Sequence, residues 1–362
     1  MRASDKVAAL VEMAKVRALG RRIPVAVRIN LNNRCHSRCR FCSFWSTPTE
    51  ELSTEEWRTV IADLSRLGAR RLSLSGGEPT LRRDLAEIVR AAVDQGIATE
   101  LNSTGYLFSE RRAALRPLEL VKLSLDGSPP VHDHIRDRPG AFAELTSGIA
   151  VLKELGVKFS FAFTMTRENL SEIPFAIELA RKHDTFVAFQ PVMATEHSAD
   201  RVREDLFPDA SDYRRAIALL VRTKLRDPRR LRNSLGGLRH IASWPAIRGL
   251  DCWAGRVFAM IEANGDVVPC DRIRYDTPAP NVRTHGVARA LSELPGFDCA
   301  GCGFCGSVGL NMLMAGRADV VPSSARVLAR RGRNRPAAHG SRLARGSRWA
   351  GHSGLAGWRR RR

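Results

Sequence analysis

The sequence predicts an α/β fold in which six strands, mostly separated by helices, form a parallel sheet or an incomplete barrel. Short β-rich runs alternate with longer segments of helical periodicity over residues 22–195. Polar or glycine-rich loops follow several of the strands, and in such folds ligands sit beyond the carboxyl ends of the strands. Composition agrees with a globular protein, because 44% of the 362 residues are hydrophobic and 27% are charged.

Local patterns place the elements in order along the chain. Segment 53–56 has a capping-box pattern, and apolar residues follow it at helical spacing until Gly68 ends the helix. Gly96 ends the next helix in the same way. The expected strands occupy residues 24–31, 71–75, 97–102, 120–125, 157–166 and 186–192. The expected helices occupy residues 5–20, 53–67, 85–95, 141–155, 170–182 and 212–225. After about residue 195 the alternation stops, and residues 257–261 and 267–268 are short β-like runs among cysteines and glycines.

The first helix is amphipathic, and we expect it to pack on the main domain. Its apolar face contains Val7, Leu10, Val11 and Ala14. The stretch is too short and too weakly apolar to favour a helix lying on a membrane surface.

Charge, cysteines and termini predict a cytoplasmic protein. No apolar run approaches the roughly 18–20 residues that span a bilayer, and the N-terminus lacks the features of a signal peptide. The eight cysteines are clustered, which in a reducing compartment indicates metal or redox chemistry. Twelve arginines and no acidic residue lie in 320–362, so the net charge of +20 falls to +8 for residues 1–319. That moderate positive charge suits an anionic substrate or nucleic acid without requiring either.

Three early cysteines have the spacing of an iron–sulfur ligand loop. Cys35, Cys39 and Cys42 form the pattern C-x3-C-x2-C directly after the first expected strand. Three thiolates leave one iron of a 4Fe-4S cluster open, and S-adenosylmethionine (SAM) can chelate that iron through its amino and carboxylate groups. Zinc is the alternative, but it usually takes four protein ligands, and no fourth cysteine lies nearby.

The cysteine loop and a second motif together resemble the radical SAM superfamily. Phe41 supplies the aromatic residue before the third cysteine, and Gly76, Gly77, Glu78 and Pro79 match the SAM-binding GGEP motif, 34 residues after Cys42. The resemblance covers residues 22–195 and implies a partial (β/α)6 barrel. It also implies that the backbone and Glu78 receive the methionine ammonium. Ser124 and Arg136 match further positions that contact SAM in the family, with the arginine suited to a carboxylate. Ser103 matches the third strand end, which the resemblance places toward ribose or substrate. Turn capping is the alternative for each.

Five later cysteines resemble the SPASM or twitch extension carried by one radical SAM branch. Cys252 and Cys270 form C-x12-G-x4-C, in which Gly265 is expected in a tight hairpin turn. Cys299, Cys302 and Cys305 follow as C-x2-C-x2-C. A full SPASM module holds two auxiliary clusters, but two complete four-cysteine clusters would need eight cysteines and only five are present. One auxiliary 4Fe-4S cluster is therefore expected, held by four of the five, and which cysteine is spare stays open. A zinc ribbon is the alternative.

We therefore expect five segments: an N-terminal helix over 1–21, the radical SAM barrel over 22–195, a helical connection over 196–250, an auxiliary-cluster module over 251–319, and a disordered basic tail over 320–362. Basic arms can bind nucleic acid through phosphates. The arginine, alanine, glycine and serine of this tail equally fit disorder or an out-of-frame translation, so no nucleic-acid partner is expected.

The expected function is reductive cleavage of SAM to a 5′-deoxyadenosyl radical, which abstracts hydrogen from a peptide or small-metabolite substrate. A reductant such as flavodoxin or ferredoxin would supply the electron. The alternatives are an RNA-modifying radical SAM enzyme and an iron–sulfur electron carrier, although a carrier needs neither an open iron nor a GGEP motif.

Overall fold

The computed structural model describes residues 3–193, 204–270, 278–297, 299 and 301–317. The predicted tail over 320–362 lies outside the described residues. Among those described, no helix is long and apolar enough to cross a membrane.

A single sheet of eight strands organises the described chain, in the order β6-β5-β4-β3-β2-β1-β7-β8. Neighbouring strands from β6 to β7 are all parallel, and β8 is antiparallel to β7. The strands are β1 (Ala26–Asn30), β2 (Arg71–Ser75), β3 (Ala98–Ser103), β4 (Leu120–Ser124), β5 (Phe159–Met165), β6 (Val187–Pro191), β7 (Phe258–Ile261) and β8 (Val267–Val268). All six strands expected in the barrel are present, and the α/β fold prediction is confirmed.

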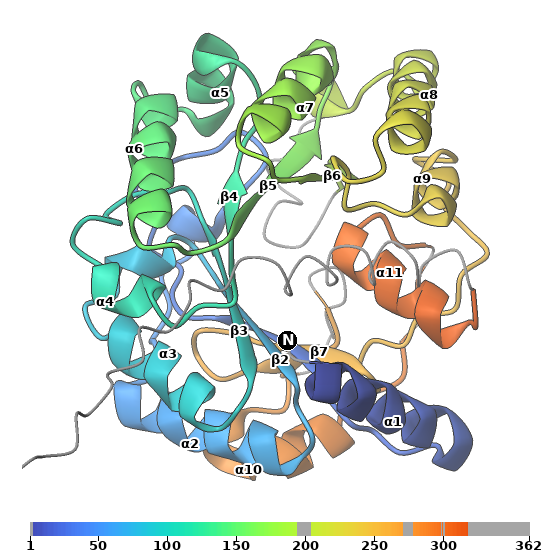
Figure 1. The fold of residues 1–362 in the computed structure, drawn as a ribbon. Helices are drawn as coiled ribbons and strands as arrows, with labels where there is room; N and C mark the ends of the chain where they lie inside the picture. The colour runs from blue at the N-terminus through green and yellow to red at the C-terminus, as the bar shows by residue number, and fades with distance from the viewer. Residues whose placement is uncertain (1–2, 194–203, 271–277, 298, 300, 318–362) are drawn as a thin grey trace, which may run out of the picture. The chain divides into compact units, whose positions relative to one another are not determined.

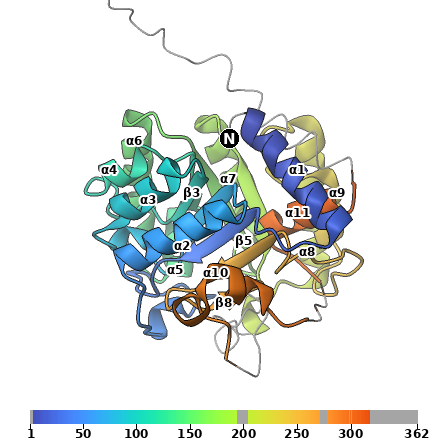
Figure 2. The ribbon, with the colours of Figure 1, turned by 90° about the horizontal axis from the view of Figure 1, so that it is seen from below.

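Helices cover the outer face of the curved sheet (Figures 1 and 2). The helices of the barrel region are α2 (Thr54–Arg66), α3 (Leu85–Asp94), α4 (Arg112–Leu115), α5 (Pro129–Arg136), α6 (Ala141–Glu154) and α7 (Ile173–Lys182). The remaining helices are α1 (Ala3–Leu19), α8 (Ala210–Arg226), α9 (Leu235–Ile241), α10 (Val282–Ser292) and α11 (Cys305–Met314). The capping box of α2 is formed, because Ser53 accepts from the Glu56 amide and the Glu56 carboxylate accepts from the Ser53 amide.

The two faces of the sheet differ in polarity. Alternate strand residues such as Ile29, Leu72 and Phe161 are fully buried and belong to the hydrophobic core, together with apolar residues of the helices. The residues between them point away from the helices and are half-buried and largely polar. The inner face of this sheet is therefore a surface on which polar ligands can be bound.

The C-terminal segment is continuous with the barrel sheet. Strand β7 pairs in parallel with β1, from Ala26 opposite Phe258 to Ile29 opposite Ile261. Gly265 has a φ of +92° in the turn between β7 and β8, as the hairpin prediction required. Helix α10 packs beside α2, and Arg283 forms an ion pair with Glu56. Residues of the expected auxiliary-cluster module thus add strands β7 and β8 to the sheet of the core.

Helix α1 packs through the face opposite to the one identified from the sequence. Val7, Leu10 and Val11 are 60%, 52% and 47% exposed, whereas Met13 and Val16 are buried. The buried pair joins a small second cluster with apolar residues near β7 and at the end of α11. The Arg17 guanidinium also donates to the carbonyl of Met314, the last residue of α11. Helix α1 lies beside α11 (Figure 2). Tertiary contacts, and not the wider apolar stripe, set the rotation of this helix.

Candidate active site

The cysteine loop leaves the carboxyl end of β1 and is anchored by the backbone of α5. The amide of Arg38 donates to the carbonyl of Arg136 at 3.3 Å, and the amide of Arg40 donates to the carbonyl of Ile135 at 3.1 Å. Both acceptors lie in the last turn of α5, where helix carbonyls have no partner within the helix. The loop thereby satisfies the helix end, and the helix end fixes the loop.

The three thiols of this loop act on one another electrostatically. Cys39 is buried, and Cys35 and Cys42 are half-buried. Burial raises the pKa of Cys35 to about 12, and the charges of Cys39, Glu78 and Cys42 add to the increase. Thiols that resist ionisation in this way become good ligands when a cationic cluster compensates their charge. Among the described residues, no three cysteine, histidine or acidic side chains are placed to bind a single metal ion.

Buried polar atoms without partners line the same loop. Asn33 Oδ1, His36 Nδ1 and Ser37 Oγ are buried and accept or donate no hydrogen bond within the described structure. Buried polar groups are rarely left unsatisfied, since each costs about 1–3 kcal/mol. Their concentration on one cysteine loop is consistent with a polar cofactor bound against it, so the residues present fit a cluster with SAM.

Arg136 connects the cysteine loop to the end of β4. Its Nη1 donates to Cys39 Sγ at 3.5 Å, and its Nη2 pairs with Asp126 Oδ2 at 2.6 Å. The guanidinium also lies 5.6 Å from the ring centre of Phe41. Burial would lower the pKa of Arg136, but the charges of Asp126 and Cys39 raise it above its ordinary value. Contacts of Arg136 and Phe41 with SAM remain predictions, and the structure adds that this cation stabilises a Cys39 thiolate.

The GGEP motif lies against the start of the cysteine loop. The amide of Gly77 donates to the carbonyl of Asn32, and the amide of Glu78 donates to the carbonyl of Arg34, both at 2.8 Å. A Cβ at Gly77 would lie 2.2 Å from the Arg34 oxygen, and one at Gly76 would lie 2.3 Å from the Asn32 oxygen. Glycine is required at both positions because the two backbones touch. Two motifs separated in sequence form one surface.

Glu78 has no exposed surface, and its carboxylate accepts five hydrogen bonds. Oε1 accepts from the amide and hydroxyl of Thr80 and from the hydroxyl of Ser103. Oε2 accepts from the amide and hydroxyl of Thr104, both at 2.9 Å. Pro79 begins the short helical turn that brings Thr80 into place. The predicted contact of Glu78 with a methionine ammonium stays a prediction, while its observed role is to join the ends of β2 and β3.

Ser103 and Ser124, the remaining serines singled out from the sequence, are the last residues of β3 and β4. Ser103 is buried against Glu78, whereas Ser124 is half-buried on the inner face. The carboxyl ends of β1 to β4 therefore bring the predicted site residues of the barrel to one rim, as the parallel arrangement required.

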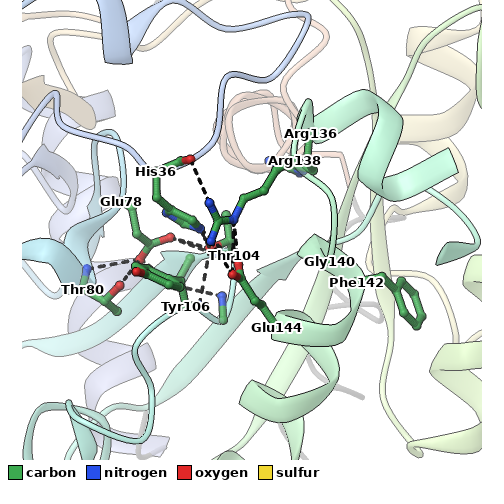
Figure 3. Close-up of polar contacts among 12 residues, drawn as sticks. His36, Glu78, Thr80, Thr104, Tyr106, Arg136, Arg138, Gly140, Phe142 and Glu144 are labelled. Atoms are coloured by element: carbon green, nitrogen blue, oxygen red, sulfur yellow. Dashed lines mark hydrogen bonds and ion pairs between the residues drawn. The ribbon is translucent and has the colours of Figure 1, made fainter. Parts of the chain in front are cut away.

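Three side chains that the sequence analysis did not indicate hold His36 in place: Tyr106, Arg138 and Glu144. We call these three residues the His36 clamp (Figure 3). The His36 ring stacks on Tyr106 with centres 4.0 Å apart. The Arg138 guanidinium donates to the His36 carbonyl at 3.4 Å and binds Glu144 through Nε at 3.1 Å. His36 Nε2 lies 3.5 Å from Glu144 Oε2, and burial lowers the pKa of His36. No spacing in the sequence links these residues, because they come from three separate loops and helices.

The five later cysteines divide into four and one. Burial raises the pKa of Cys302 to about 12, and the charges of Cys252, Cys270 and Cys299 act in the same direction. The Cys302 carbonyl lies 3.1 Å from His240 Nε2, which ties this loop to α9. These four sulfurs are therefore electrostatic neighbours.

Cys305 has different surroundings. It is the first residue of α11, and burial raises the pKa of its thiol. The charges that oppose this increase belong to Arg232, Lys122 and Lys224, and not to other cysteines. The electrostatic surroundings of Cys305 therefore differ from those of the other four cysteines.

The sequence matches the Radical SAM superfamily over residues 29–180. It is 33% identical over 260 residues to a PqqA peptide cyclase of Rhodopseudomonas palustris, which covers 68% of this chain and 67% of the cyclase. This chain belongs to the radical SAM superfamily. Membership confirms the resemblance deduced from the cysteine loop and the GGEP motif, and it implies a 4Fe-4S cluster and SAM as cofactors.

Other radical SAM proteins share more limited likeness with this one. An Fe-coproporphyrin III synthase of Methanosarcina barkeri is 31% identical over 199 residues, or 53% of this chain and 49% of the synthase. The chain thus spans about half the length of that relative. The solved structure of anSMEcpe with bound AdoMet and Cp18Cys peptide matches with a TM-score of 0.58 and 18% identity, covering 75% of this radical SAM chain and 80% of that one. At that identity the likeness concerns the fold.

Proposed function

We propose that this protein holds a 4Fe-4S cluster on Cys35, Cys39 and Cys42 and uses SAM to abstract hydrogen from a peptide or small-metabolite substrate. Such a cluster, when bound, supplies the electron that cleaves the sulfonium of SAM into methionine and a 5′-deoxyadenosyl radical. The observation that carries the proposal is the direct backbone contact between the cysteine loop and the GGEP glycines at Gly77 and Arg34.

The residues of the chain would prepare this chemistry in separable ways. Arg136 stabilises negative charge on Cys39 through its hydrogen bond to the sulfur. Glu78 keeps the ends of β2 and β3 in a fixed relation through its bonds to Thr80, Ser103 and Thr104. Cys39 is buried and Cys35 and Cys42 are half-buried, which limits the access of water to the three thiols. These groups position and protect the cofactors.

We assign the auxiliary 4Fe-4S cluster to Cys252, Cys270, Cys299 and Cys302. Four cysteines complete the ligation of one such cluster, and in this set the charges of the other three act on Cys302. Cys305 is the spare thiol on this assignment. An auxiliary cluster held there would supply a group that accepts or delivers an electron during oxidation of the substrate.

The substrate class is inferred from relatives. A PqqA peptide cyclase and an Fe-coproporphyrin III synthase are similar in sequence, and anSMEcpe is similar in fold with a peptide bound. A peptide or small metabolite, converted during peptide maturation or the biosynthesis of a cofactor or natural product, is consistent with all three. We place the reaction in the cytoplasm, with flavodoxin or ferredoxin as the reductant.

The test is anaerobic reconstitution followed by reduction with dithionite in the presence of SAM. Wild-type protein should form 5′-deoxyadenosine, Cys39→Ala should form none, and Cys270→Ala should retain measurable formation. Cys305→Ala serves as the matched cysteine control and should behave as wild type. Equal formation by wild type and Cys39→Ala, or none by wild type at full iron content, would contradict the proposal.

A further inference from the structure

A buried asparagine of α11 is joined to the loop that carries Cys252. Asn311 has no exposed surface. The amide of Trp253, the residue after Cys252, donates to Asn311 Oδ1 at 3.0 Å, across 58 positions of the chain. Leu310 and Leu313 of α11 pack against the same small apolar cluster as Cys252 and Trp253. A polar side chain in such surroundings needs partners for both ends of its amide.

The bond from Trp253 fixes which way the Asn311 amide faces. A backbone N–H can only donate, so the side-chain atom that it contacts must be the oxygen. The NH2 group of Asn311 therefore faces away from the Trp253 amide. Asn311 Nδ2 is buried and makes no hydrogen bond with any described group. A buried donor is thus left over beside the loop of Cys252.

The thiol of Cys252 is the group on which this donor acts. Burial raises the pKa of Cys252, whereas the Ala254 amide and the Asn311 side chain act to lower it. A group that lowers a thiol pKa stabilises the thiolate, which is the form of cysteine that binds a metal. A protonated thiol is a weak acceptor, and a thiolate is a stronger one. The bond from Asn311 to this sulfur is therefore expected once a metal replaces the thiol proton.

A structural link between α11 and the loop does not by itself explain an asparagine. An acceptor is all that the Trp253 amide needs, and Asn311 adds a buried donor that is unfavourable without a partner. Asn233 shows the satisfied case at 5% exposure. Its Oδ1 accepts from the Phe189 amide at 2.9 Å, and its Nδ2 donates to the Phe189 carbonyl at 2.8 Å. The comparison indicates that Asn311 Nδ2 serves a group at Cys252.

We propose that Asn311 is a positioning residue of the auxiliary site, where its Nδ2 donates a hydrogen bond to Cys252 Sγ and makes a bound cluster easier to reduce. This inference rests on the proposed function, because it requires the auxiliary 4Fe-4S cluster assigned to Cys252 and three further cysteines. Reduction adds one electron and increases the negative charge on the sulfurs, so a donor at one sulfur favours the reduced form. The chain would thereby set how readily the auxiliary cluster takes an electron.

Pulsed EPR of the full-length chain, labelled with ¹⁵N-asparagine, tests the hydrogen bond. A Cys39→Ala background leaves the auxiliary cluster as the paramagnetic centre after reconstitution and reduction with dithionite. The cluster spin should couple to an asparagine nitrogen, and Asn311→Asp should abolish the coupling, because aspartate keeps the acceptor for Trp253 but has no N–H. Asn233→Asp, the same change at an asparagine bonded through both ends, is the matched control and should keep the coupling.

Redox titration in the same background measures the effect on reduction. Asn311→Leu is close in volume to wild type and removes the donor without adding a charge. At the midpoint potential of the parent Cys39→Ala protein, this variant should have a ratio of oxidised to reduced cluster about tenfold higher, which for one electron is a midpoint about 59 mV lower. Asn233→Asp should have the midpoint of the parent.

The outcomes separate this inference from the function on which it rests. A parent protein with about four irons per chain that shows no asparagine coupling, or that keeps the coupling in Asn311→Asp, would overturn the hydrogen bond. Equal midpoints in Asn311→Leu and the parent would overturn the effect on reduction. A parent protein that binds no iron, or binds zinc instead, would overturn the assigned auxiliary cluster together with this inference.

Discussion

The guanidinium of Arg136 donates a hydrogen bond to the sulfur of Cys39 across 3.5 Å while its other terminal nitrogen pairs with Asp126. Both side chains of the pair are nearly or fully buried. The arrangement ties the middle cysteine of the loop to the end of β4 through one cation. It makes the charge on that cysteine dependent on a residue nearly one hundred positions away.

Removing this cation should destabilise the protein as well as the loop. Arg136→Gln leaves the Asp126 carboxylate buried without its partner, and we expect the free energy of unfolding to fall by about 3–5 kcal/mol. Urea denaturation monitored by circular dichroism measures the change. The double variant Asp126→Asn, Arg136→Gln should recover part of the loss. A single variant as stable as wild type would show that the buried pair contributes nothing.

Gly77 should not tolerate a side chain, since its Cβ would lie 2.2 Å from the Arg34 oxygen. Gly77→Ala should push the GGEP turn away from the cysteine loop, at a cost on the order of 1–3 kcal/mol. We expect reduced iron uptake on reconstitution and a lower midpoint of thermal unfolding. Gly309→Ala is the matched control, because nothing lies within 4 Å of the added methyl group in α11. Equal iron content in Gly77→Ala and Gly309→Ala would show that the close contact between Gly77 and the Arg34 carbonyl is not needed to hold the cysteine loop.

The division of the later cysteines predicts a difference in iron content. Wild type and Cys305→Ala should each bind about eight irons per chain, for two 4Fe-4S clusters, whereas Cys302→Ala should keep about four. Iron and sulfide analysis with Mössbauer spectra measures this. Loss of four irons in Cys305→Ala, with all eight retained in Cys302→Ala, would show that Cys305 and not Cys302 is a ligand of the auxiliary cluster. About four irons together with zinc in wild type would show that the later cysteines form a zinc ribbon.

The His36 clamp should slow the escape of iron from the cysteine loop. Arg138 donates to the His36 carbonyl and to Glu144, so Arg138→Gln removes charge-assisted hydrogen bonds that hold the loop. We expect iron loss to a chelator to become about tenfold faster, the equivalent of about 1.4 kcal/mol. Arg112→Gln breaks a surface pair with Glu154 and is the matched control. Equal rates of iron loss in Arg138→Gln and Arg112→Gln would show that the His36 clamp does not contribute to cluster retention.

The contact between α2 and α10 should depend on pH through Glu56. Hydrogen bonds from Arg283 and the Ser53 amide lower the pKa of Glu56 from 4.5 to about 2. A depressed pKa means that the stabilisation is complete above pH 4.5 and is lost as the pH falls toward 2. Because the carboxylate is largely exposed, Glu56→Gln should cost only on the order of 0.5–1 kcal/mol at pH 7.

Urea denaturation of wild type and Glu56→Gln at pH 7 and pH 3.5 measures this dependence. The difference between their free energies of unfolding should be smaller at pH 3.5 than at pH 7. A gap of constant size would show that the Glu56 charge is not involved.

Several elements could be predicted from local pattern alone. The sequence predicts the strand 71–75 at its observed bounds, because apolar residues alternate there and a glycine pair ends the run. The capping box at Ser53 and the hairpin glycine at Gly265 were also identified, since each depends on residues only a few positions apart. Both cysteine groups were recognised by spacing, but spacing could not show which of the five later cysteines stands apart.

The sequence by itself determined the α/β alternation, the cysteine loop, the GGEP turn and hence the family, because backbone periodicity and short ligand spacings are local properties. Only the tertiary structure decided that β7 joins β1, that α1 packs through Met13 and Val16, and that Arg136 reaches Cys39. These outcomes depend on which distant surfaces meet when the chain closes, and burial and charge neutralisation at those surfaces are not encoded in the spacing of neighbouring residues.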